Sequence, residues 1–395
     1  MRSAAEHLAQ VLALMPPPDL HVVRLADALG QVVAADVCAR VALPPFDNSS
    51  MDGYAVRAAD VARASASAPV ALAVVGESAA GHPWTGEVAA GEAARIMTGA
   101  VLPAGADAVI PQEEVAATDG TVLVASPVHA GRFVRRRGED AGAGDVVVAA
   151  GTVLAPRHLA AAASSGVERV MVTRPPRVAY LVTGDELVAP GGVLGPGQIF
   201  DSNAAYLAAA LRALGAVPVD LGVVRDRPAD VLAAVSGADA DLVVTTGGAS
   251  VGAHDPVKAG LAAAGVAFLN VAIQPGKPQG LGCVEGVPVV CLPGNPVAVA
   301  VCVEVFVGPA VRAMRGVPEP VWEPRRALEA WRCPPVREQV MPVVISAEGV
   351  RPATPGGSGS HLAASLAAAD GLARVHAEAD TVEVGDIVAV RRFTA

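Results

Sequence analysis

Between residues 177 and 316, short runs rich in β-branched residues alternate with segments of helical periodicity. The runs predict strands at 177–182, 217–223, 241–245, 266–269 and 288–292. Helices are expected to start at Asp201 or Ser202, near Pro228, at Asp255-Pro256 and at Asn295-Pro296, where a capping residue or a proline stands. Strands that alternate with helices form a mostly parallel sheet covered on both faces. We therefore expect an α/β domain here.

The remaining segments have a different character. Residues 46–139 are rich in valine, glycine and proline and contain several turn sequences, which predicts a β-rich insertion. Residues 319–395 begin with prolines and end in a valine-rich run, which predicts a small β domain behind a proline linker. The first 15 residues predict an amphipathic helix that ends at Pro16 and is not a signal peptide. A chain of 395 residues is long enough for several such domains.

Composition argues against several classes of partner. The formal net charge of −10 provides no basic surface for nucleic acid or for anionic membranes. The longest apolar run, 287–311, is broken by prolines and by Glu304, so we do not expect it to span a membrane. The five cysteines form no CxxC pair, which favours reduced thiols and a cytoplasmic location over disulfides or zinc.

The sequence TTGGASVGAHD, residues 245–255, follows one of the predicted strands and precedes a helix. Ligands of parallel sheets bind beyond the carboxyl ends of the strands, where glycines allow backbone N–H groups to approach an anion. Ser250 adds a hydroxyl donor, and the following helix adds its positive end. The stretch therefore indicates an anion site, although a plain strand-to-helix turn would have a similar composition.

Three further strand ends support a site at the same edge of the sheet. They are Thr183-Gly-Asp-Glu186, Arg225-Asp226 and Leu292-Pro-Gly-Asn-Pro296. Together with Asp255 they bring several carboxylates close to the predicted anion site, a combination typical of Mg²⁺ bound to phosphates. Taken singly, each acid could instead be a helix cap or an exposed turn residue.

Positive charge near this edge can come from two lysines. Lys277 lies in the turn Gln274-Pro-Gly-Lys-Pro278, and Lys258 lies one turn inside a predicted helix, where an exposed lysine without a function is equally plausible. His82, His254 and His361 share no ligand spacing, so we assign no metal to them.

Nine segments, in this order along nearly the whole chain, resemble the molybdopterin molybdenumtransferases, which are similar to the C-terminal domain of gephyrin. They are FDNSSMDGYA (46–55), RIMTGA (95–100), RRRGED (135–140), TGDEL (183–187), DSN (201–203), TTGGASVGAHD with Lys258, PGKP (275–278), LPGNP (292–296) and SGSHL (358–362). Any one of these segments is a weak signal, but the ordered set is specific.

The resemblance implies a multidomain architecture and a homodimer. The expected parts are an elongated linker domain (1–45 with 140–175), a β-rich insertion domain (46–139), an α/β molybdopterin-binding domain (176–318) and a C-terminal β-barrel-like domain (319–395). Each active site would lie in the α/β crevice, closed by the insertion domain of the partner subunit.

The resemblance also implies the reaction. Adenylyl-molybdopterin and molybdate would give molybdenum cofactor and AMP, with Mg²⁺ as cofactor and a molybdopterin adenylyltransferase as a possible partner. The residues implied as catalytic are Asp52, Thr98, Asp140, Glu186, Asp226 and Asp255, of which Asp52, Glu186 and Asp255 are the metal ligands. Residues implied to bind the pterin phosphates or molybdate are Thr183, Gly184, Asp185, Ser202, Gly247, Gly248, Ser250, Gly252, Lys258, Pro275, Lys277, Pro293, Asn295 and Pro296.

One departure from the family pattern concerns the oxyanion. Several relatives have lysines where this chain has Asn270 and Gln274, so the affinity for molybdate, and the preference for molybdate over tungstate, are open. Two other functions remain as alternatives. A molybdopterin adenylyltransferase has a similar TGG domain but lacks MDGYA and GED, and a non-catalytic scaffold would bind the cofactor without turnover.

Overall fold

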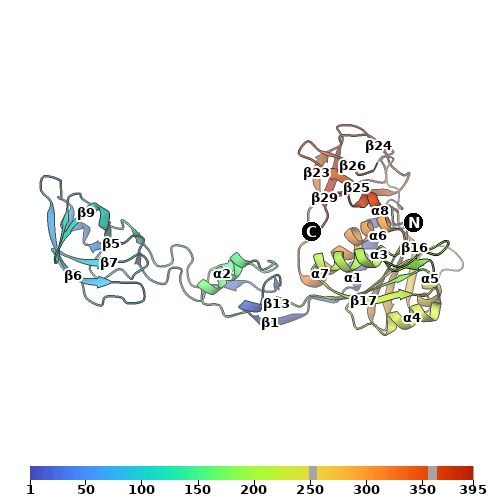
Figure 1. The fold of residues 1–395 in the computed structure, drawn as a ribbon, viewed down its shortest axis with the longest axis horizontal. Helices are drawn as coiled ribbons and strands as arrows, with labels where there is room; N and C mark the ends of the chain where they lie inside the picture. The colour runs from blue at the N-terminus through green and yellow to red at the C-terminus, as the bar shows by residue number, and fades with distance from the viewer. Residues whose placement is uncertain (249–255, 355–362, 395) are drawn as a thin grey trace. The chain divides into compact units, whose positions relative to one another are not determined.

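The computed structural model describes residues 1–248, 256–354 and 363–394, which form two compact units (Figure 1). The first unit comprises Met1–His21, Gly30–Ala34 and Val172–Ala395, and the second comprises Val22–Leu29 and Ala35–Met171. The four-part division expected from the family resemblance is finer than this and stays a prediction.

A six-stranded sheet forms the centre of the first unit, in the order β17-β14-β18-β22-β21-β19. The strands are β14 (Arg177–Thr183), β17 (Val217–Val224), β18 (Leu242–Thr246), β19 (Val266–Asn270), β21 (Pro278–Val284) and β22 (Val287–Leu292). Strands β17, β14, β18 and β22 are parallel, whereas β21 is antiparallel to both of its neighbours. The predicted mostly parallel sheet and its five predicted strands are confirmed.

Strand β21 was not predicted, because it begins with Pro278 and contains two glycines. Both glycines lie where neighbouring groups approach closely: a Cβ on Gly282 would lie 2.1 Å from the carbonyl oxygen of Gly265, and one on Gly280 would lie 2.8 Å from the Cβ of Cys291. Proline and glycine usually weaken a strand signal, and here they mark close packing inside the sheet instead.

Helices cover both faces of this sheet, as the alternation predicts (Figure 1). The helices are α1 (Ala4–Leu14), α3 (Asn203–Ala213), α4 (Pro228–Ser236), α5 (Pro256–Leu261), α6 (Pro296–Cys302) and α7 (Gly308–Arg315), with a π-helix (Val303–Val307) between the last two. Val178 and Tyr180 pack on the side of α1, α3 and α7, while Ala179 and Leu181 pack on the side of α4 and α5. The apolar segment Pro296–Arg315 is long enough to span a membrane, but it is 89% buried and serves as a core helix.

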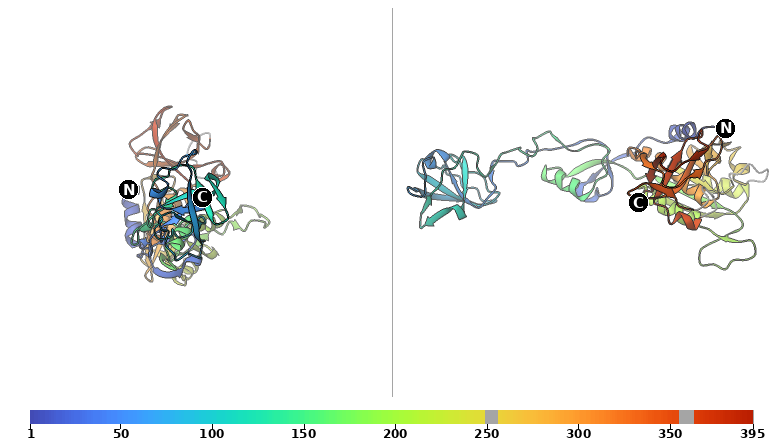
Figure 2. Two further views of the ribbon diagram at one scale, coloured as in Figure 1. Left: turned by 90° about the vertical axis from the view of Figure 1, so that its left-hand side faces the viewer. Right: turned by 90° about the horizontal axis from the view of Figure 1, so that it is seen from above.

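A second sheet of the first unit is built from the C-terminal strands, red in Figures 1 and 2, and confirms the predicted β domain. Its order is β20-β25-β27-β29-β23, with β26 paired to β25. The strands are β20 (Ile273–Gln274), β23 (Glu323–Arg326), β25 (Glu338–Ile345), β26 (Val350–Pro352), β27 (Gly371–Val375) and β29 (Ile387–Arg392). Strands β24 (Trp331–Arg332) and β28 (Thr381–Val382) form a separate two-stranded sheet. Strand β20 comes from the α/β segment of the chain, and it pairs in parallel with β25.

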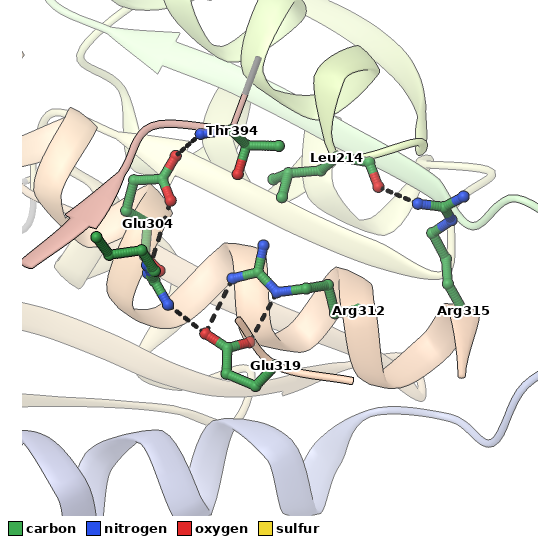
Figure 3. A network of polar contacts seen from close by, with 7 residues as sticks. Leu214, Glu304, Arg312, Arg315, Glu319 and Thr394 are labelled. Carbon is green, nitrogen blue, oxygen red and sulfur yellow. Dashed lines mark hydrogen bonds and ion pairs between the residues drawn. The ribbon is translucent and has the colours of Figure 1, made fainter. Parts of the chain in front are cut away.

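An ion-pair network, buried at Arg391 and Glu304 but 42% exposed at Glu319, links the core helix to the last strand (Figure 3). Glu319 accepts hydrogen bonds from Arg312, at 2.7 and 3.0 Å, and from Arg391. Arg391 also donates to the carbonyl oxygen of Glu304 and lies 3.6 Å from its carboxylate. The side chains of Arg391 and Glu304 are only 6% and 5% exposed. Burial raises the pKa of the Glu304 carboxyl, an effect that Arg391 opposes.

The second unit is rich in β structure, as predicted for the insertion. Its main sheet has the order β8-β5-β7-β6-β10-β9. The strands are β5 (Gly53–Val56), β6 (Val70–Ser78), β7 (Glu92–Ile96), β8 (Ala108–Pro111), β9 (Val115–Thr118) and β10 (Thr121–Val124). Smaller elements are the pair β4 (Asn48–Ser49) and β11 (Val134–Arg135), the pair β3 (Val37–Cys38) and β12 (Val146–Val148), and helix α2 (Pro156–Ser164).

Candidate active site

A cavity of about 440 Å³ lies at the carboxyl edge of the α/β sheet, where the sequence predicts a crevice. The ends of β14, β18 and β22 meet there, because these strands run in parallel. Ten of the predicted site residues line it: Thr183, Gly184, Glu186, Ser202, Asp226, Gly247, Gly248, Pro293, Asn295 and Pro296. Pro278 lines it as well, since β21 starts at the edge where β19 ends.

The glycines of this edge are required by close approaches of the backbone. Gly247 has φ +85°, and a Cβ there would lie 2.4 Å from the carbonyl oxygen of Thr183. On its other side, a Cβ on Gly294 would lie 3.3 Å from the Cα of Gly247. The loops after three strands are thus packed directly against one another, and only glycine fits at the centre.

Asn203 connects these loops, and the sequence did not single out its role. Its buried amide donates to the Thr246 hydroxyl (3.0 Å) and to the Gly294 carbonyl (2.8 Å). The preceding Asp201 caps α3, since its carboxylate accepts from the backbone N–H groups of Asn203 (2.9 Å) and Ala204 (3.1 Å). The DSN segment was the available signal, but a sequence cannot show that its third residue reaches two other loops.

Two buried polar atoms of the cavity wall lack a hydrogen-bond partner within the described residues. They are the hydroxyl oxygen of Thr183 and the amide oxygen of Asn203. Buried polar atoms are nearly always paired, and exceptions in a cavity often indicate a ligand or a water. These atoms therefore fit a site that is completed by a polar ligand.

Three acidic residues line the cavity: Asp201, which is buried and caps α3, and Glu186 and Asp226, which are exposed. Asp226 is held in place by a reciprocal pair of hydrogen bonds with Asp185. Each carboxylate accepts from the other residue's backbone N–H, at 3.4 Å. Asp185 thus supports the edge between β14 and β17 and does not itself line the cavity.

Other predicted residues of the first unit lie outside the lining found for this cavity. Lys258 and Lys277 are exposed, and Pro275 is buried next to the loop whose Gly276 carbonyl accepts from Gln279 (2.7 Å). The backbone carbonyl of Lys277 accepts from Val271 (2.8 Å), which fixes the turn but not the ammonium group. Their roles in binding stay predictions.

Some predicted residues cannot be placed. Ser250, Gly252 and Asp255, and the SGSHL segment at 358–362, lie outside the described residues.

In the second unit, the structure brings three of the recognised segments together. Asp52 accepts from the backbone N–H of Thr98 (2.7 Å) and from its hydroxyl (2.8 Å), which lowers the pKa of the Asp52 carboxyl. Next to this pair, Asp47 accepts from Arg136 (2.7 Å) and from the backbone of Arg137 (2.8 Å). Asp140 is exposed at the end of the same arginine-rich turn.

The donor groups of the crevice bear on whether it can hold a metal ion. Within the described ranges, no cluster of three or more His, Cys, Asp or Glu side chains could hold a metal ion. Glu186 and Asp226 nevertheless provide two carboxylates beside unpaired polar atoms. Mg²⁺ usually binds through one or two carboxylates plus phosphate oxygens, so this pair fits Mg²⁺ that arrives with a phosphorylated ligand.

Comparison with protein families identifies three segments of the chain. Residues 2–166 match the MoeA N-terminal region (domain I and II), residues 179–313 a probable molybdopterin binding domain, and residues 324–393 the MoeA C-terminal region (domain IV).

Individual relatives agree with this assignment. Molybdopterin molybdenumtransferase 2 of Mycobacterium tuberculosis is 39% identical over 398 residues, which cover 97% of each chain. The molybdopterin molybdenumtransferase of Haemophilus influenzae is 40% identical over 313 residues, covering 78% of this chain and 76% of the relative. A solved structure of a molybdopterin biosynthesis MoeA protein from Pyrococcus horikosii has a TM-score of 0.87 and 34% identity, and the match covers 100% of this chain and 99% of that one.

Proposed function

The chain belongs to the MoeA family of molybdopterin molybdenumtransferases, enzymes of molybdenum cofactor biosynthesis, and from this premise we propose how its crevice acts. The substrates are adenylyl-molybdopterin and molybdate, and AMP leaves as molybdenum enters the cofactor. The cavity at the carboxyl edge of the sheet supports this proposal most directly, since it combines close-packed glycine loops with two exposed carboxylates.

The loops of the crevice have distinct tasks in this scheme. Backbone N–H groups at Gly247 and Gly248 and the hydroxyls of Thr183 and Ser202 bind phosphate oxygens, as glycine-rich strand ends do in parallel sheets. Asn203 ties the end of β18 to the loop after β22, so the donors on these two segments keep their spacing when the substrate binds.

The carboxylates of Glu186 and Asp226 would hold Mg²⁺, which supplies Lewis-acid polarisation of the phosphoanhydride when it is bound. Asp52 and Asp255 remain predicted as further ligands, with Thr98 and Asp140 as further catalytic residues. Lys258, Lys277 and the prolines at 275, 293 and 296 remain the predicted contacts of the phosphates and of molybdate.

We also propose a homodimer in which the partner subunit's Asp52 completes each crevice. This assembly rests on the family resemblance, together with the fact that Asp52 belongs to a different compact unit from Glu186. The adenylylated substrate requires a molybdopterin adenylyltransferase upstream. We place the enzyme in the cytoplasm, because its five cysteines lie in described parts of the chain and form no disulfide there.

The decisive experiment measures AMP released from adenylyl-molybdopterin by the purified chain. AMP release should require both molybdate and Mg²⁺, because hydrolysis is coupled to metal insertion. Equal release without molybdate, or full release in excess chelator, would contradict the coupled reaction.

The composite site is tested with heterodimers of Asp52→Ala and Glu186→Ala subunits. Each homodimer should be nearly inactive. An isolated heterodimer should have about half the wild-type rate if the sites act independently, since one site is then intact and the other carries both changes. A heterodimer as inactive as its parents places both acids in the same chain's site.

A further inference from the structure

One wall of the crevice is apolar and has no task in the reaction described above. It consists of Leu187, Ile199 and Phe200, from the parallel pair β15 (Leu187–Val188) and β16 (Ile199–Phe200). Ile199 is 55% exposed and Phe200 is 45% exposed. The other lining residues are mostly polar side chains, prolines and glycines, so this wall stands out in its chemistry.

Phe200 is one of two exposed phenylalanines in this chain, the other being Phe46, and it is the one that lines the cavity. Only 3% of its residues are aromatic, six of them phenylalanine, and its cores are built mainly from valine, alanine and leucine. Burial of a large aromatic ring stabilises a fold substantially, as with Phe306 in the centre of the first unit. A ring left half exposed inside a ligand cavity forgoes that gain, and contact with a ligand would restore it.

The backbone on both sides of Phe200 is anchored. The N–H of Ile199 donates to the Glu186 carbonyl (3.0 Å), and the N–H of Asp201 donates to the Val188 carbonyl (2.9 Å). Asp201 is fixed further because its carboxylate caps α3. The ring is therefore presented from a short, doubly held segment, which is the kind of support that a precise binding contact requires.

We propose that Phe200 is a stacking platform for a planar nitrogen heterocycle of the substrate. This assignment rests on the proposed function, whose substrate contains two such rings, a pterin and an adenine. Either ring has a π face that an aromatic side chain can cover, while the glycine loops of the same cavity would bind the phosphates and the carboxylates would hold their Mg²⁺. Phe200 thereby selects substrates with a flat ring over other phosphorylated molecules.

The test is a set of calorimetric titrations with three probes: neopterin monophosphate, AMP and ribose 5-phosphate. The variants are Phe200→Leu, which removes the ring but keeps an apolar side chain, and Phe200→Trp, which keeps a ring. Val193→Ala is the matched control, because it removes exposed apolar area from the loop between β15 and β16, outside the cavity lining, without changing an aromatic group. Thermal melting verifies that each variant is folded.

Phe200→Leu should lower the affinity for the probe whose ring stacks on Phe200. The expected loss is about tenfold, within the range for stacking of a base on an aromatic side chain. Phe200→Trp should bind that probe as tightly as the wild type, and ribose 5-phosphate should bind equally to all variants. A loss with neopterin monophosphate alone identifies the pterin, and a loss with AMP alone identifies the adenine. The platform is overturned if Phe200→Leu binds both ring probes as tightly as wild type does. It is also overturned if Phe200→Leu loses as much affinity for ribose 5-phosphate as for the ring probes.

Failure of this inference can be separated from failure of the proposed reaction. If wild-type protein releases AMP in a molybdate-dependent way while Phe200→Leu binds both rings normally, only the platform is wrong. If Phe200→Leu loses affinity for a ring probe but not for ribose 5-phosphate, while wild-type protein releases no AMP, the platform stands and the proposed reaction is wrong.

Discussion

Two groups of acidic residues in the first unit lie in opposite surroundings. Glu186 and Asp226 are exposed on the crevice wall, where solvent and ligand can reach them. Glu304 lies under the C-terminal strand, where it shares Arg391 with Glu319, and Arg312 bonds to Glu319 from the other side (Figure 3).

The difference concerns hydration. An exposed carboxylate keeps its contact with water, so it remains accessible to a cation. A buried carboxylate loses its hydration, and it is tolerated only where a partner and further hydrogen bonds compensate. We therefore expect changes in the buried network to alter stability, and changes in the crevice to alter activity.

The largest effect is expected for Arg391→Met. It leaves Glu304 buried without its cation, which should lower the free energy of unfolding by about 3–5 kcal/mol. Urea denaturation measures this loss. Arg392→Met is the control, since that arginine is exposed on the same strand.

A further change distinguishes lost pairing from lost packing. Adding Glu304→Gln to Arg391→Met should recover part of the stability, because the unpaired charge is then removed. Equal stability of Arg391→Met and wild type would mean that the network contributes nothing.

Glu186→Gln should show the reverse pattern. AMP release should fall by about 100-fold, as is common when an electrostatic group of an active site is removed, while the free energy of unfolding stays within about 0.5 kcal/mol of wild type. Glu378→Gln, an exposed acid outside the crevice, serves as the control for activity. A fully active Glu186→Gln protein would remove this residue from the site.

His7 extends the comparison to a buried base. Its ring packs edge-on against Phe306, with ring centroids 4.9 Å apart, and burial, followed by the charge of Arg2, lowers its pKa to about 4. The unfolded chain titrates near 6.5, so between these values the unfolded state binds more protons than the folded state. The stabilisation is complete above about pH 6.5 and is lost as the pH falls toward 4.

Wild-type protein should thus lose up to about 3 kcal/mol of stability through His7 over that range. The dependence of the free energy of unfolding on pH should be weaker in His7→Leu than in wild type. It should be unchanged in His376→Leu, which alters an exposed histidine of the same unit. Denaturation curves at pH 4, 5, 6 and 7 provide the measurement, and parallel slopes for His7→Leu and wild type would contradict the assignment.

The smallest effect is expected at Asp52, in the second unit. Thr98→Ala removes the hydroxyl donor but keeps the backbone N–H, so the lowered pKa of Asp52 should rise only part of the way to its ordinary value. Carbon-13 NMR titration of the carboxyl group follows this shift, with Thr98→Ser as the control that keeps a hydroxyl. An unchanged pKa in Thr98→Ala would exclude the hydroxyl bond in solution.

The crevice could be predicted from sequence because its residues follow strand ends. Parallel strands end at one edge, so Thr183, Asp226 and Gly247 had to meet once the alternation was recognised. The bridging role of Asn203 could not be predicted, because it depends on the spacing between loops that are 43 and 91 residues away.

The buried network had no sequence signal at all. Glu304 stands alone in an apolar run, and Arg391 follows 87 residues later in the pair Arg391-Arg392, so nothing in the sequence links the two charges. Only the packing of the last strand against the core helix shows that they are partners.

The pairing of β20 with β25 has a consequence for the integrity of the first unit. Two residues of the α/β segment form the edge strand of the C-terminal sheet, so the two parts of the chain are joined by this strand pairing as well as by the connecting peptide. A protease that cut this peptide near Val321 would leave both fragments bound to each other, held by the pairing of β20 with β25 and by the contacts of Arg391 with Glu304 and Glu319. Such a nicked protein would migrate as one species in its native form and separate only in denaturant.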